Sequence, residues 1–135
     1  MGENAKSPAV LELLRSDRWA LAEVATSIGP GLIRFRTPVL SGRRRPGYGR
    51  ALKVVWAYAA EGSGALPSDG DSARMSDFED RLCEVVEHDA QAVLVAILIF
   101  DGARQWVFYT DDAREFLVRL DRAARVDRRA ASGLS

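Results

Sequence analysis

The sequence predicts an α+β domain with the element order β-β-β-α-β-β-α, a two-layer sandwich in which a five-stranded antiparallel sheet carries two helices on one face. Two observations predict this class. Apolar residues recur at every second position in the strand-like segments of the first half, and at every third or fourth position after residue 68. Beyond that helical stretch, two more strand-like segments precede a second helical stripe.

The first segments carry clear boundary signals. Residues 8–16 (PAVLELLRS) predict a short helix with a proline in its first turn, and residues 19–26 predict a strand. The glycine- and proline-rich residues 27–31 predict a turn into a second strand over residues 32–37. In that strand apolar residues alternate with arginines, which indicates one solvated face.

An arginine-rich segment, GRRRPGYGR at residues 42–50, comes next. Pro46 and the flanking glycines predict a hairpin loop that joins the second strand to a third strand over residues 51–59. Tyr48 is expected to fold back from this loop onto the sheet. The third strand alternates between its two faces, and Trp56 lies on the more apolar one.

Residues 61–68 predict a loop, and a helix follows it. The helix has two possible starts, a capping box formed by Ser76 and Glu79 or an earlier start at residues 68–69. Its charged residues, Glu87 among them, are expected to face solvent. Its buried stripe consists of Met75, Phe78, Leu82, Val85 and Val86.

Nine consecutive apolar residues, 92–100, predict a strand that is buried on both faces. The dipeptide Asp101–Gly102 is a preferred hairpin turn, and residues 104–109 complete the hairpin. Residues 110–112 provide capping groups for a final helix. The apolar stripe of that helix consists of Ala113, Phe116, Leu117, Leu120 and Ala124.

The chain therefore divides into residues 1–17, an N-terminal helix or arm, residues 18–124, a single α+β domain, and residues 125–135, a flexible tail. The element order is that of a circularly permuted ferredoxin-like sandwich. In that topology the strands lie in the order first, second, third, fifth, fourth. The sheet face without helices must be covered either by the N-terminal helix or by the matching face of a second subunit in a homodimer.

Charge and cysteine content restrict the function classes. The 19 basic and 19 acidic residues cancel, so bulk charge does not indicate a nucleic-acid or membrane partner. The charge is nevertheless uneven, with ten basic and four acidic residues up to Lys53 and nine basic and fifteen acidic residues after it. A single cysteine, Cys83, excludes an internal disulfide and favours the reducing cytoplasm. No segment is long and apolar enough to predict a membrane span.

The chemistry-bearing residues do not form a catalytic pattern. His88, the only histidine, is expected at a helix end between two carboxylates, where it interacts favourably with the helix dipole. Cys83 and His88 are five residues apart, about 140° around a helix, so they do not pair as nucleophile and base. We expect no catalytic residues, no metal site and no cofactor, and therefore no enzyme.

Several motifs carry a family resemblance. They are Gly64–Pro67 (GALP), Phe78–Leu82 (FEDRL), the Asp101–Gly102 turn, and Arg104–Asp111 (RQWVFYTD). Over residues 18–122 the chain resembles a bacterial family known as domain of unknown function 695. That family is distantly similar to ferredoxin-like regulators of ribonuclease E, and the resemblance implies a regulatory domain without assigned catalytic residues.

Two functions follow as hypotheses. The first is a non-enzymatic regulatory domain that binds another protein through its polarised surface or its sheet face, where Trp56, Trp106 and Tyr109 are the candidate residues. The alternative is an RNA- or anion-binding module. Its candidate residues form a basic edge of Arg34, Arg36, Arg43, Arg44, Arg45 and Arg50.

Overall fold

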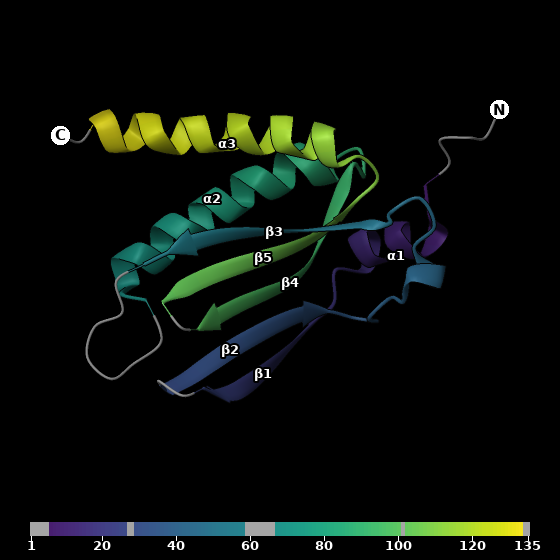
Figure 1. Cartoon of the computed structure of the whole chain (residues 1–135), viewed down its shortest axis with the longest axis horizontal. Helices are drawn as coiled ribbons and strands as arrows, with labels where there is room; N and C mark the ends of the chain where they lie inside the picture. The colour runs from purple at the N-terminus through teal and green to yellow at the C-terminus, as the bar shows by residue number, and fades with distance from the viewer. Residues whose placement is uncertain (1–5, 27–28, 59–66, 101, 134–135) are drawn as a thin grey trace.

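The computed structural model describes residues 6–26, 29–58, 67–100 and 102–133. These residues form an α+β fold with one open, five-stranded antiparallel sheet (Figure 1). In chain order the elements are α1 (Pro8–Ser16), β1 (Trp19–Thr26), β2 (Gly29–Arg36), the short 3-10 helix η2 (Gly42–Arg44), β3 (Arg50–Ala57), α2 (Asp69–Glu87), β4 (Ala92–Phe100), β5 (Ala103–Thr110) and α3 (Ala113–Gly133).

The sheet order is β1-β2-β4-β5-β3, which corrects the predicted order. β2 pairs with β4 instead of β3, and β3 forms the far edge beside β5. The circularly permuted ferredoxin-like arrangement requires β2 beside β3, so the observed pairing does not confirm it. The physical reason lies in β4, because a strand that is apolar on both faces is stable in the interior of a sheet and would expose apolar surface at an edge.

Among the described residues there are three α-helices besides the 3-10 helix η2, one more than the predicted layer contains. α2 and α3 lie together on one side of the sheet (Figure 1). We call this side the helix face. Its buried core consists of Met75, Phe78, Leu82, Val86, Ala92, Leu94, Ile97, Trp106, Phe108, Phe116 and Ala123. The core joins alternate residues of β4 and β5 to one stripe of each helix, as the sequence periodicity predicts.

A second, smaller core lies on the opposite face of the sheet, at the end where β4 begins. There α1 buries Val10 and Leu13 against Val93, with Leu40 and Tyr48 beside them. The N-terminal helix therefore covers one end of this second face. Ser7 caps α1, since its hydroxyl accepts the Val10 N–H, and Asp17 ends the helix in a left-handed conformation with φ 49°.

The arginine-rich connection is not the predicted hairpin loop. β2 and β3 are separated by β4 and β5, so residues 37–49 cross from one half of the sheet to the other edge. Leu40 and Tyr48 from this connection pack under α1, and the Tyr48 hydroxyl donates to the carbonyl of Ala90. Tyr48 thus folds back onto the sheet as predicted, although its loop has a different path.

The rest of the second face is apolar and only partly covered. Phe35, Ala96 and Val107 form one row across β2, β4 and β5, and Ile33 and Leu98 pair in the next row. All five residues are intermediate in exposure. These residues alternate with those of the helix-face core, so α2 and α3 lie on the other side of the sheet from them.

Helix α2 begins at the earlier of its two predicted starts. The Ser68 hydroxyl accepts the Asp71 N–H, so Ser68 is the N-cap. Glu79 therefore has no role in a capping box. Glu87, which the sequence predicts on the solvent side, instead faces the sheet, where it bonds Arg36. At the other end of the fold, α3 is capped by Asp112 and continues through residues 125–133, the segment predicted as a tail.

Candidate binding surfaces

The six arginines of the predicted basic edge do not share one surface. Arg36 is 5% exposed on the helix face of the sheet. Its guanidinium donates to Glu87 Oε2 at 2.9 Å, to Asp17 Oδ1 at 2.8 Å and to the Leu94 carbonyl at 3.0 Å. Arg36 is thus neutralised inside the fold, and its role is structural.

Glu87 lies partly buried beside this arginine. It accepts the Leu94 N–H at 2.8 Å as well as the Arg36 bond, so the ion pair satisfies both backbone groups of Leu94. Burial raises the pKa of the Glu87 carboxyl above its usual value, while the Leu94 bond and the charge of Arg36 lower it by less.

Arg45 is also engaged within the fold, but on the opposite face of the sheet. Its guanidinium lies 3.8 Å from the centre of the Tyr109 ring and donates to the Tyr48 carbonyl at 2.7 Å. Arg34 is exposed on the helix face, where it lies 5.1 Å from the Trp19 ring. Arg43, Arg44 and Arg50 are exposed, and within the described part of the chain they have no carboxylate partner.

The three aromatic candidates are also divided between the faces. Tyr109 lies on the second face under Arg45, whereas Trp56 and Trp106 lie on the helix face. Trp106 is fully buried, and its indole N–H donates to Glu79 Oε1 at 2.8 Å. Trp56 packs edge-on against Trp106, with ring centres 6.4 Å apart, and is only partly covered.

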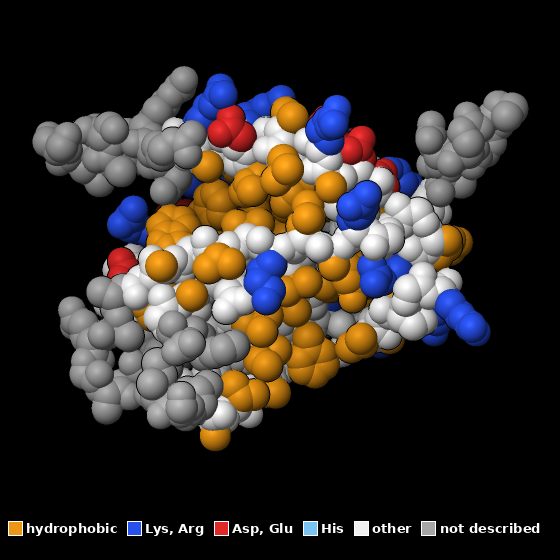
Figure 2. All heavy atoms as spheres, in the orientation of Figure 1, with side chains coloured by type: hydrophobic (Ala, Val, Ile, Leu, Met, Phe, Trp, Pro, Cys, Tyr) orange, Lys and Arg blue, Asp and Glu red, His pale blue; other side chains and the backbone are white. Residues whose placement is uncertain are grey.

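Trp56 and Trp106 together line an apolar groove beside the edge strand β3. The groove has a volume of about 320 Å³, within the range of ligand-binding clefts. Figure 2 shows it as a hollow of apolar side chains between α3 and β3. The lining residues are Val54, Val55, Trp56, Phe78, Trp106, Leu120 and Ala124. The groove exists because α3 packs on α2 and the core, which leaves the helix face of the edge strand open.

The border of this groove is basic. Arg74 extends over the Trp56 ring at 5.6 Å from its centre, and Arg50 and Lys53 are exposed on β3. Residues 37–57 contain no aspartate or glutamate. Lys and Arg side chains border the hollow in Figure 2. An apolar ligand segment with negative charge therefore complements this surface better than a neutral or basic one.

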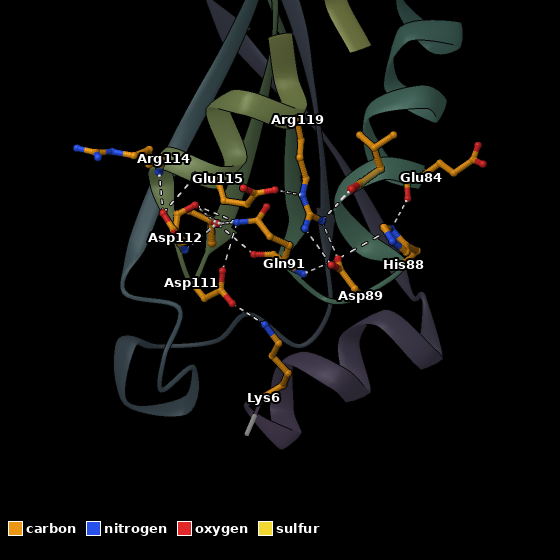
Figure 3. A network of polar contacts seen from close by, with 12 residues as sticks. Lys6, Glu84, His88, Asp89, Gln91, Asp111, Asp112, Arg114, Glu115 and Arg119 are labelled. Carbon is orange, nitrogen blue, oxygen red and sulfur yellow. Dashed lines mark hydrogen bonds and ion pairs between the residues drawn. The ribbon is translucent and has the colours of Figure 1, made fainter. Parts of the chain in front are cut away.

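A polar network joins the end of α2 to the start of α3 (Figure 3). Arg119 binds both oxygens of Asp89, at 2.8 and 3.0 Å, and also Glu115 and the Val85 carbonyl. The hydrogen bonds from Arg119 lower the pKa of Asp89 to about 2. Because Arg119 of α3 bonds both the Val85 carbonyl of α2 and Asp89 just after it, the network is a clamp between the two helices.

His88 and Cys83, the two residues that the sequence offers as candidates for chemistry, lie at the end of α2 and within it, respectively. His88 is the C-cap of α2, and its Nδ1 lies 3.1 Å from the Glu84 carbonyl. Burial raises the pKa of the Cys83 thiol, which disfavours a reactive thiolate. Residues 6–26, 29–58, 67–100 and 102–133 contain no group of three metal-binding side chains, and no helix formed by them is long and apolar enough to cross a membrane.

A model of the family of unknown function DUF695 matches residues 17–132. The chain belongs to the DUF695 family. The match confirms the resemblance drawn from the sequence motifs and covers all five strands, α2 and most of α3, whereas α1 lies outside it. Comparisons of this DUF695 domain with curated proteins and with solved structures find no match.

Sequence reasoning missed two partly buried acids of this DUF695 domain, Glu79 and Glu87. Glu79 bonds both Arg104 and Trp106, and Glu87 bonds Arg36. A signal was present, because Glu79, Cys83 and Glu87 are spaced four residues apart and so lie in one row next to the apolar stripe of α2. Acids in such a row are placed to meet arginines on the sheet below.

Proposed function

We propose that this chain is a non-enzymatic regulatory domain that acts by binding another protein, and that the groove lined by Trp56 and Trp106 is its binding site. The observation that carries the proposal is an apolar cleft of about 320 Å³ that stays open beside an edge strand. An open apolar cleft in a small domain is the default candidate for a ligand or protein contact.

A capture experiment with matched variants tests this function. Ala124 lines the groove, so Ala124→Trp is expected to fill it, whereas Val118 is 49% exposed on the same helix and is not among the lining residues. Wild-type, Ala124→Trp and Val118→Trp proteins are immobilised and exposed to lysate of the native cell, with and without nuclease. Circular dichroism and thermal melting first establish that all three are folded.

We expect wild-type and Val118→Trp proteins to capture the same partner from both lysates, and Ala124→Trp to lose it. A partner captured equally by Ala124→Trp would place binding elsewhere and refute the groove. A partner lost from the nuclease-treated lysate would show that RNA is the ligand and refute protein binding.

RNA binding is the second candidate, on one observation. Arg43, Arg44 and Arg50 are exposed without carboxylate partners in the described part of the chain, on a segment that contains no acidic residue. Three phosphate contacts with a single strand predict a salt slope of about −2 in log K against log salt. Single-stranded RNA titrated against wild-type protein and an Arg43→Ala/Arg44→Ala variant tests this. Affinity that is independent of salt or unchanged in the variant would exclude it.

A further inference from the structure

Strand β3 offers a free hydrogen-bonding edge next to the groove. Within the part of the chain that the structure describes, β3 pairs with β5 along its whole length, from Arg50 opposite Thr110 to Ala57 opposite Ala103, and has no strand on its other side. Half of the backbone N–H and C=O groups of an edge strand point away from its sheet. A ligand with an extended backbone pairs with such groups, whereas a helix satisfies its own backbone bonds internally.

The side chains of β3 add a second requirement. Leu52, Val54 and Trp56 lie on the helix face of the strand and are each only partly covered. A strand added beside β3 would direct every second side chain toward the same face, below α3. Alternate apolar side chains of the added strand would therefore enter the groove, next to Leu120 and Ala124.

Charge selects the kind of strand. Strand alternation places Arg50 on the groove side at one end of β3, while Arg74 lies over Trp56 at the other end, and Lys53 is exposed between them on the second face. Opposite charges on neighbouring strands stabilise their pairing, and like charges weaken it. Lys53 also opposes edge-to-edge pairing of two copies of this chain, since lysine in the middle of an edge strand has that effect.

We propose that β3 accepts an additional antiparallel or parallel strand from a partner protein, an extended acidic segment in which apolar residues alternate with aspartate or glutamate. The apolar side chains fill the groove, and the acidic side chains between them meet Lys53 on the second face. Acidic side chains at the two ends of the segment, on the groove side, meet Arg50 and Arg74. The proposal rests on the protein-binding function above and names the class of partner. From Arg50 to Trp56 the edge is about 20 Å long, which matches a segment of about six residues.

The test begins with peptides. A library of displayed random peptides is selected on the wild-type protein, and the enriched sequences are synthesised with a fluorescent label for anisotropy titrations. We expect enriched peptides to alternate apolar and acidic residues. Enrichment of basic peptides, of helical patterns or of no sequence would overturn the proposal.

Backbone pairing is tested with N-methylated versions of the enriched peptide. Two peptides are made, each methylated at every second amide. One set of methyl groups removes the N–H donors that face β3, and the other set removes only the donors that point away from β3. We expect one set to lose binding by at least about tenfold and the other to bind within about twofold of the parent peptide. Equal effects of both sets would show that no strand is added.

Charge and groove are tested on the protein side. Arg74→Glu is expected to weaken peptide binding by about threefold or more, whereas Arg18→Glu, the same change at the entrance to the opposite edge strand, leaves it unchanged. Ala124→Trp is expected to weaken binding by about tenfold, and Val118→Trp is the control. Equal effects of Arg74→Glu and Arg18→Glu would overturn the charge selection.

Different results would refute the two proposals, protein binding at the groove and strand addition to β3. If a cellular partner depends on the groove but binds through a segment that is insensitive to N-methylation, protein binding is supported and strand addition is overturned. If the protein self-associates through β3 at the concentrations of the titration, measured by sedimentation, a second copy is the occupant and the acidic partner strand is overturned.

Discussion

Replacement of Glu87 tests how the buried arginine is held. Glu87 accepts two bonds, from Arg36 at 2.9 Å and from the Leu94 N–H at 2.8 Å. The regular pairing of β2 with β4 ends at Phe35 and Ala96, and β4 has a register shift between Leu94 and Ala96. The Arg36–Glu87 pair therefore replaces the missing ladder bonds of Leu94. The carboxylate oxygens of Glu87 matter here first as hydrogen-bond acceptors.

The expected magnitudes follow from these contacts. Glu87→Ala leaves the Leu94 N–H without its acceptor, at about 1–3 kcal/mol, and removes one partner of a buried arginine, for a total of about 3 kcal/mol. Asp17 remains beside Arg36 but is 64% exposed, so it compensates the charge only weakly. Glu87→Gln keeps an acceptor oxygen, and because burial raises the pKa of Glu87, loss of the charge itself costs little. A raised pKa means that the folded state favours the neutral carboxyl over the charged one, so we expect Glu87→Gln to lie within about 1 kcal/mol of wild type.

Urea unfolding followed by tryptophan fluorescence and by circular dichroism measures both variants. A loss of about 3 kcal/mol lowers the midpoint by about 1–3 M at ordinary slopes. Because the folded-state pKa of Glu87 is raised, wild type should lose stability relative to Glu87→Gln as the pH rises from 4.5 through the folded-state value. A Glu87→Gln protein as unstable as Glu87→Ala would show that charge attraction holds Arg36 and would refute this reasoning.

Three further predictions concern the helix clamp, the second core and the cysteine. Arg119 lowers the pKa of Asp89 from 3.8 to about 2, so the stability that Asp89 contributes is present above pH 3.8 and is lost as the pH falls toward 2. Because 44% of the Asp89 side chain is exposed, we expect this contribution to the free energy of unfolding to be at most about 1 kcal/mol. Asp89→Asn should therefore lose less stability than wild type when the pH is lowered, as measured by urea unfolding at each pH. Tyr48→Phe removes the bond to the buried Ala90 carbonyl and should cost about 1–2 kcal/mol in urea unfolding, so an unchanged midpoint would contradict that bond. Burial raises the pKa of the Cys83 thiol, so a thiol reagent should label the native protein much more slowly than the unfolded protein, and equal rates would show an open site.

Local structure could be predicted from the sequence wherever a periodicity and a boundary residue coincide. The helix of residues 8–16 has proline in its first turn, and the strand of residues 92–100 is a continuous apolar run, and both elements have the predicted bounds. The strand of residues 19–26 also has its predicted bounds. The second strand begins earlier than predicted, at Gly29, because two glycines and a proline continue the pairing with β1.

The strand order could not be read from periodicity, because periodicity assigns a residue to a face and does not identify the neighbouring strand. A short loop between β2 and β3 favoured their pairing. The stronger signal was the composition of the strands, since β4 is apolar on both faces and β3 carries Lys53 at its middle. These patterns belong to a central strand and an edge strand, respectively.

The candidate groove depends on that order. The sequence indicates that Trp56 shares a face with Val54, but only the position of β3 at the edge leaves this face open beside α3. Likewise, Arg34 and Arg36 lie on the same face of β2, yet Arg34 is exposed whereas Arg36 is buried, with 5% of its surface exposed. Their difference depends on Glu87, which lies 51 residues away along the chain from Arg36.

The fold explains part of the uneven charge of the two halves of the sequence. Part of the basic excess of the first half meets acids of the second half, as in the pairs Arg36–Glu87 and Lys6–Asp111. Four exposed basic residues without a carboxylate partner in the described residues, Arg43, Arg44, Arg50 and Lys53, lie on the connection and on β3, while Arg18 and Arg34 lie at the opposite side of the sheet. The edge strand that borders the apolar groove therefore keeps a positive charge that the fold does not neutralise. A surplus of positive charge beside unpaired strand backbone and open apolar surface is the combination that an acidic, extended segment of a partner protein would complete.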